Sequence, residues 1–131
     1  MDGEEKPDRL PGKKSVHKPL IQSFGFAFQG IGAVIRKERN FKIHMTMAVM
    51  VVLAGIVCRI SVTEWCICLI LFALVMSLEM VNTSIEAVVD LVTEERKPLA
   101  KLAKDTAAGA VLISAILAAI IGLIIFIPKV C

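Results

Sequence analysis

The sequence predicts an all-α integral membrane protein, with one N-terminal amphipathic helix at the membrane interface and three transmembrane helices. Of its 131 residues, 56% are hydrophobic and the mean hydropathy is +0.76, which is too apolar for an ordinary soluble domain. Nine of the fifteen Lys and Arg lie in residues 1–42 and four more in residues 96–104, so basic patches flank the apolar segments. These patches suit anionic lipid headgroups, and because they lack interleaved aromatic residues we expect no nucleic-acid partner.

The N-terminal part divides into a tail and an interfacial helix. Residues 1–19 are charged, contain Pro and Gly, and have no apolar core of the signal-peptide type, which predicts a disordered cytoplasmic tail. From residue 20 to about residue 37, apolar residues recur at helical spacing while polar residues occupy the opposite face. This pattern favours an amphipathic helix lying in the interface, and the alternative is a helix packed on a soluble core. Residues 20–131 then form a single membrane domain.

The first transmembrane helix is expected at about residues 41–60. Only residues 45–58 are free of charge and His, so Lys42 and Arg59 must extend their side chains to opposite interfaces. Ser61 and Glu64 have the spacing of a capping box that begins the next helix, expected at about residues 62–92.

The third transmembrane helix is expected at about residues 98–127. Pro98 suits the first position of a helix, and residues 107–127 are an uninterrupted uncharged run. Pro128 is expected to end this helix. The two basic regions predict that the N-terminus lies inside the cell and the C-terminus outside.

A polar stripe runs along the second transmembrane helix. At about 100° per residue, its four members fall within roughly 80° of one another. An acidic side chain at the bilayer centre costs about 2.5–3.5 kcal/mol, so such a stripe indicates a functional site. Its residues are Glu79, Asn82, Glu86 and Asp90.

This stripe has the composition that phosphoryl transfer needs. Carboxylates and phosphates together bind Mg²⁺, Lys neutralises the transferred group, and a carboxylate accepts the proton of the attacking hydroxyl. Glu79 is the deepest and least solvated carboxylate, so it is the candidate general base, whereas Glu86 is placed to meet a metal-bound nucleotide. The chain lacks both a P-loop and the signature set of a protein kinase, so a kinase here must be of another type.

Several residues also have simpler interpretations. Cys66 and Cys68 have the spacing of half a metal site, but apolar packing is favoured because no second His/Cys cluster accompanies them. His44 is interpreted as an interfacial or packing residue, with a catalytic role as the alternative. Taken alone, Glu38 is interpreted as part of a solvated charged patch, and Lys104-Asp105 is interpreted as an exposed pair.

Three stretches resemble the prokaryotic diacylglycerol kinases, a family of small integral-membrane lipid kinases. These stretches are residues 38–40, residues 79–90 with the pattern Glu-x-x-Asn-x-x-x-Glu-x-x-x-Asp, and residues 103–111 with Lys-Asp. The likeness covers about residues 20–130. It implies a homotrimer in the plasma membrane of a bacterium, with active sites that neighbouring subunits share at the cytoplasmic face. It also implies ATP as the phosphoryl donor, Mg²⁺ as the cofactor and a lipid alcohol as the acceptor.

The resemblance also implies roles for individual residues. Glu79 matches the catalytic base, and Glu38 and Glu86 match the carboxylates that hold the metal carried by ATP. Asn82 matches a polar active-site residue and Asp90 an acidic position near the nucleotide. The implied ATP-binding residues are Phe26, Glu38, Glu86, Glu95, Arg96, Lys97, Lys104 and Asp105. Arg96-Lys97 departs from the Tyr-His often found there, which leaves the contact to the base or ribose open.

The lipid is the finer question. The start of the first transmembrane helix, residues 98–101 and the Ile-Pro-Lys ending resemble Gram-positive members of the family, which are similar to undecaprenol kinases. We therefore expect phosphorylation of undecaprenol, with diacylglycerol as the alternative. Two other classes remain open at this stage: a small oligomeric proton-coupled transporter and a non-enzymatic membrane adaptor.

Overall fold

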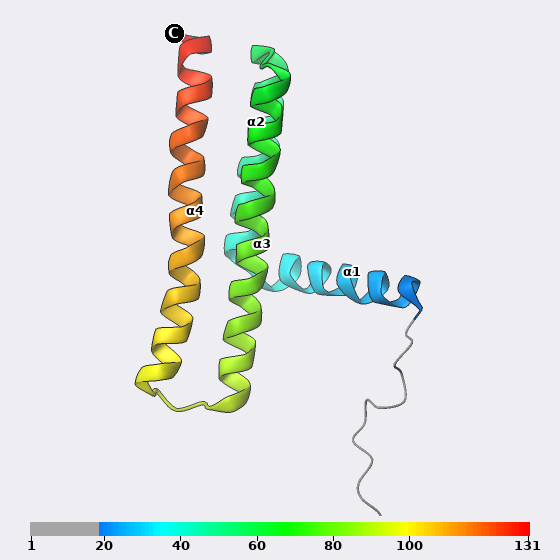
Figure 1. The fold of residues 1–131 in the computed structure, drawn as a ribbon, viewed down its shortest axis with the longest axis vertical. Coiled ribbons are helices and arrows are strands. Elements are labelled where there is room, and N and C mark those ends of the chain that lie inside the picture. Colours follow the sequence, from blue (N-terminus) through cyan, green and yellow to red (C-terminus); the bar gives the residue numbers. More distant parts are fainter. Residues whose placement is uncertain (1–18) are drawn as a thin grey trace, which may run out of the picture.

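The computed structural model describes residues 19–131, and within this range every regular element is an α-helix. The helices are α1 (Leu20–Lys37), α2 (Arg39–Cys58), α3 (Val62–Val92) and α4 (Pro98–Val130). Figure 1 shows α3 and α4 side by side and antiparallel, α2 behind α3, and α1 projecting sideways from the corner where α2 begins. The predicted tail lies outside the described residues, except for Pro19.

Three of the helices, α2, α3 and α4, are long and apolar enough to cross a membrane. Many of their large apolar side chains lie on the surface of the single chain; Val57, for example, is 81% exposed and Ile113 is 64% exposed. Exposing this much apolar surface to water is energetically unfavourable, so lipid chains or neighbouring helices are expected to cover it. The predicted all-α fold with three helices capable of spanning the membrane is therefore confirmed.

A corner between α1 and α2 fixes the direction of the first helix. Glu38 has an extended backbone (φ −98°, ψ 114°), and its N–H donates to the carbonyl of Val34 at 2.8 Å, which ends α1. Val34, Phe41 and Met76 pack together beneath this corner, with Phe41 only 4% exposed. This contact between three helices holds Glu38 close to the middle of α3.

Both ends of helix α2 lie two residues closer to the N-terminus than the expected range of 41–60. Its end is set by Arg59, which adopts a left-handed backbone conformation (φ 51°, ψ 55°). The N–H of Arg59 bonds to the carbonyl of Ile56, and the N–H of Ile60 bonds to that of Gly55 at 3.2 Å. These two bonds form a Schellman motif, and buried Ile60 supplies the apolar contact that often accompanies it.

Local signals also explain where α3 and α4 begin. Ser61 accepts a hydrogen bond from the backbone N–H of Glu64 at 3.2 Å, as a capping box requires. The Ser61 hydroxyl in turn donates a hydrogen bond to the Glu64 carboxylate at 3.1 Å. The second bond of this capping box therefore joins two side chains, and the Ser61 backbone N–H does not take part in it. Pro98 occupies the first turn of α4, where its missing N–H costs no hydrogen bond.

The end of α4 differs from the prediction, because the helix continues through Pro128 to Val130. A proline removes one N–H from the helix but does not prevent the last exposed turn from forming. That turn is completed by the N–H of Cys131, which bonds to the carbonyl of Ile127 at 3.0 Å.

Candidate active site

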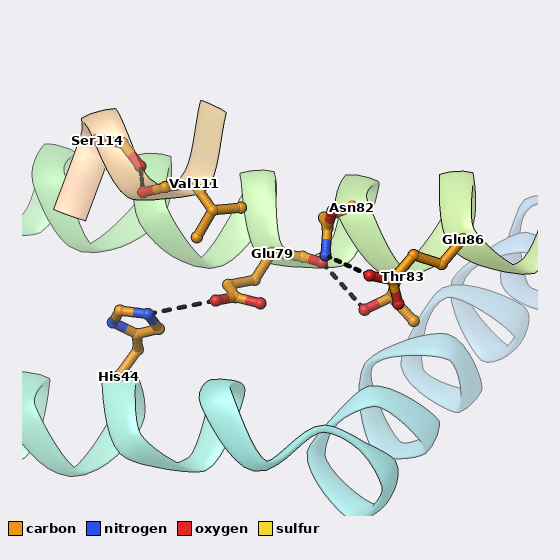
Figure 2. Close-up of polar contacts among 7 residues, drawn as sticks. All are labelled: His44, Glu79, Asn82, Thr83, Glu86, Val111 and Ser114. Atoms are coloured by element: carbon orange, nitrogen blue, oxygen red, sulfur yellow. Dashed lines mark hydrogen bonds and ion pairs between the residues drawn. The ribbon is translucent and has the colours of Figure 1, made fainter. Parts of the chain in front are cut away.

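The most buried acidic side chain is Glu79, in the middle of α3. Its residue surface is only 3% exposed, the lowest value for any polar residue in the described range. The backbone carbonyl of Glu79 accepts a hydrogen bond from the Thr83 hydroxyl at 3.1 Å, one turn further along the helix (Figure 2). A buried carboxylate needs polar partners, so the groups around Glu79 define the site.

His44 of α2 is the side-chain partner of this carboxylate. Its Nε2 lies 3.2 Å from Oε1 of Glu79, and Figure 2 shows the imidazole pointing across from α2 to α3. The favoured interpretation of His44 as an interfacial or packing residue was therefore incomplete. Helical spacing within α2 could not reveal the contact, because it depends on which face of α2 meets α3.

The next turn of the stripe contains a second pair. Nδ2 of Asn82 donates to Oε1 of Glu86 at 3.3 Å. The amide oxygen of Asn82 is buried and has no hydrogen-bond partner within residues 19–131. A buried acceptor without a donor is unusual in a folded protein and suits a site completed by another molecule.

Two further carboxylates, those of Glu38 and Glu86, lie in the same region as Glu79. Glu38 and Glu86 lie close enough to Glu79 for their charges to act on its carboxylate. Glu38 comes from the corner and Glu86 from the same face of α3, so two distant parts of the sequence supply the cluster. A cation bound near these carboxylates would offset the repulsion among their negative charges.

The end of the stripe pairs with α4. Lys104 Nζ lies 2.6 Å from Oδ1 of Asp90, and Lys101 pairs with Asp105 one turn apart on α4. Lys104 and Asp105, expected together as nucleotide contacts, thus have different partners. Both residues lie on the half of α4 that is nearest the α3–α4 loop. Figure 1 shows that the start of α4 and the loop lie below the level of α1.

The remaining predicted ATP-binding residues are exposed. Glu95, Arg96 and Lys97 lie in the loop between α3 and α4, where the Glu95 N–H bonds to the Thr93 hydroxyl at 3.1 Å. Lys97 and Glu95 form a loose ion pair at 4.0 Å. Phe26 is on α1, with 55% of its surface exposed. The structure thus places the predicted residues on four segments: α1, the corner, α3 with its loop, and α4.

A groove of about 630 Å³ is lined by residues of α3 and α4 beside the stripe. Its lining is apolar except for Asn82 and Thr106, and α4 contributes small residues such as Ala103 and Ala107. Asn82 therefore lies at the border between the apolar groove and the carboxylates.

No three His, Cys, Asp or Glu side chains in the described part of the chain are grouped to hold a metal ion. Mg²⁺ does not require such a group, because it takes one or two carboxylates together with water and substrate phosphates. The oxygens of Glu38 and Glu86, with the unpartnered amide oxygen of Asn82 nearby, fit this hard cation. All four cysteines, including Cys66 and Cys68, are free thiols.

The fold and the site together define a small helical membrane protein with a buried acidic centre. Its sequence matches the family Prokaryotic diacylglycerol kinase over residues 25–126, so the chain belongs to this family and is a lipid kinase. The family predicted from the sequence is thereby confirmed, and the transporter and adaptor alternatives are not retained.

Three curated relatives support this assignment. The undecaprenol kinase of Bacillus subtilis strain 168 is 47% identical over 110 residues, covering 84% of this chain and 89% of that protein. A diacylglycerol kinase of Synechocystis is 39% identical over 127 residues, 96% of this chain and 72% of that protein. A diacylglycerol kinase of Pseudomonas aeruginosa is 30% identical over 93 residues, 71% of this chain and 76% of that protein.

Proposed function

We propose that this protein transfers the γ-phosphoryl group of ATP to undecaprenol, which yields undecaprenyl phosphate at the cytoplasmic face of the plasma membrane. The observation that carries the choice of lipid is the 47% identity to an undecaprenol kinase across most of both chains. Diacylglycerol is the second candidate, because other relatives and the family itself are named for it.

Glu79 acts as the general base in this proposal. Its carboxylate takes the proton of the lipid hydroxyl as that oxygen forms a bond to the γ-phosphorus, while the bond from phosphorus to the bridging oxygen breaks and ADP leaves. The burial of Glu79 supports the role, because a site closed to water keeps the carboxylate available to the lipid hydroxyl. No other carboxylate in the described residues is as buried.

Glu38 and Glu86 would hold the Mg²⁺ that accompanies ATP, and Asn82 supports the carboxylate of Glu86. When bound, this ion neutralises negative charge on the phosphates. Lys104 adds a positive charge toward the nucleotide, and Asp90 holds its ammonium group in place. The other nucleotide contacts are then Phe26, Glu95, Arg96, Lys97 and Asp105, carried over from the family pattern.

The assembly is proposed to be a homotrimer with shared active sites. The extensive exposed apolar surface of α2, α3 and α4 and the unpartnered oxygen of Asn82 support contacts beyond one chain. Mixed trimers of two inactive variants, Glu79→Gln and Lys104→Ala, test the sharing. Partial recovery of activity is expected, whereas mixtures as inactive as either variant would show that each chain holds a whole site.

The membrane placement is also part of the proposal. The N-terminus is cytoplasmic, the C-terminus is outside, and α1 lies as an amphipathic helix in the cytoplasmic interface. The exposed apolar side chains of Leu20, Phe24 and Phe28 support this position for α1, because lipid chains at the interface would cover them.

The deciding experiment uses the purified full chain in nanodiscs with Mg²⁺ and labelled ATP. Undecaprenol and dioleoylglycerol are supplied at equal mole fraction, separately and in competition. We expect faster labelling of undecaprenol in both formats. Preferred labelling of dioleoylglycerol would replace the substrate, and no labelling of either lipid by folded protein would refute the proposed function.

A further inference from the structure

We infer that His44 is a positioning residue for Glu79, which orients the carboxylate so that one of its oxygens faces the lipid hydroxyl. The inference rests on the proposed function, since it concerns how the general base of that reaction is held. It assigns a role to a side chain that lies outside the polar stripe of α3.

The geometry of the pair supports this role. His44 Nε2 is 3.2 Å from Oε1 of Glu79, and the two side chains come from different helices. In Figure 2 the second carboxylate oxygen is directed away from the imidazole. One oxygen of Glu79 is therefore engaged, and Oε2 is left to accept a proton.

The chemistry of the two groups fixes the direction of this hydrogen bond. An ionised carboxylate only accepts hydrogen bonds, so the Nε2 of His44 must carry the hydrogen whenever Glu79 is ready to act as a base. A neutral imidazole protonated on Nε2 and an imidazolium both supply that donor. The hydrogen bond therefore persists in either state of His44.

The surroundings of Glu79 explain why a positioning group is needed. Its side chain is only 5% exposed, so water cannot replace a lost partner, and the nearby negative charges of Glu38 and Glu86 repel the carboxylate. The side chain of His44 is 26% exposed and reaches from α2 to α3. Its neighbour in the sequence, Met45, packs against the apolar core. Without the imidazole, the carboxylate would rotate away from its productive orientation.

The test compares substitutions that keep or remove a donor at the position of Nε2. His44→Gln places an amide N–H near that point, His44→Asn places one too close to the main chain, and His44→Leu keeps apolar volume without any donor. Thr46→Ala, at an exposed position of α2 away from the pair, is the matched control. Each full-length variant is assayed in nanodiscs for kcat and for KM of ATP, with undecaprenol and dioleoylglycerol as acceptors.

We expect His44→Leu and His44→Asn to lower kcat about 100-fold with an unchanged KM for ATP, because a misplaced base slows only the chemical step. His44→Gln should retain kcat within about 5-fold, and Thr46→Ala should match the wild type. In a Glu79→Gln background, His44→Asn should cause little further loss, because the group it positions is already gone.

Three results would overturn the inference: wild-type kcat in His44→Asn, equal losses in His44→Gln and His44→Asn, or additive losses in the double variant. If His44→Leu does not fold, the comparison of His44→Gln with His44→Asn still decides. Failure of the proposed function looks different, because the wild-type protein would then phosphorylate neither lipid.

Discussion

Lys104 on α4 and Asp90 on α3 form an ion pair across the interface of the two helices, with 2.6 Å between Nζ and Oδ1. The two residues are 14 positions apart in the sequence, and the α3–α4 loop brings them together. Both side chains are partly exposed, so the pair contributes little to stability, about 0–1 kcal/mol. Its effect is to hold the ammonium group of Lys104 near the end of the polar stripe.

The first prediction concerns this ion pair. Asp90→Asn should raise the KM for ATP about 5-fold while kcat changes less than 2-fold, because Lys104 keeps its charge but loses its orientation. The melting temperature in detergent should shift by no more than about 2 °C. Glu94→Gln, in the exposed loop, is the control and should change neither value. A large loss of kcat in Asp90→Asn would instead place Asp90 in the chemical step.

The second prediction separates the roles of two carboxylates on the same face of α3. Glu79→Gln should lower kcat by at least about 100-fold and leave ATP binding intact, because only proton transfer is lost. Glu86→Gln should weaken binding of the Mg²⁺ complex of ATP itself. Calorimetric titration in the presence of Mg²⁺ and a steady-state assay distinguish the two effects. Equal turnover in the wild type and Glu79→Gln would remove Glu79 from the role of base.

Those two carboxylates also show how much of the site the sequence predicts. Their common face follows from helical periodicity, which is a local property, and Ser61 and Pro98 mark helix starts for equally local reasons. The contact of His44 with Glu79 is not local. It depends on the rotation of α2 against α3, and apolar residues surround α2 so evenly that no stripe reveals which face is buried.

Other misses have the same origin. The left-handed conformation of Arg59 is rare for a residue with a side chain, so helical periodicity does not predict it. The hydrogen bond from the Ile60 N–H to the Gly55 carbonyl holds it in place. The ion pair of Lys104 with Asp90, which helical spacing does not predict, likewise arises from packing between helices. By contrast, the family was predictable, because its motifs combine residue type with fixed spacing.

The third prediction concerns packing at the end of α2. A Cβ added to Gly55 would lie 2.7 Å from Cη2 of Trp65 and 3.0 Å from Cδ1 of Ile60, so the Trp65 ring must move. Gly55→Ala should therefore destabilise the protein by about 1–3 kcal/mol. Gly122→Ala, where the added Cβ meets nothing within 4 Å, is the control. Thermal unfolding in detergent measures both variants, and equal melting temperatures would contradict this account of the α2–α3 turn.

The fourth prediction tests the orientation in the membrane. Thirteen of the fifteen basic residues lie in residues 1–42 and 96–104, so these regions should be cytoplasmic. Cys131 lies at the opposite end of the helices from the α3–α4 loop (Figure 1). In a variant whose other cysteines are replaced by Ser, Cys131 should react with a membrane-impermeant maleimide added to intact cells.

The matched variant carries its single cysteine in the α3–α4 loop, as Thr93→Cys with all four native cysteines replaced. This thiol should react only after the membrane is permeabilised, because the loop lies on the side where ATP is available. Reversed labelling of the two variants would put the polar stripe at the outer face. A kinase that uses cytoplasmic ATP could not work in that orientation, so the measurement tests the proposed reaction as well as the topology.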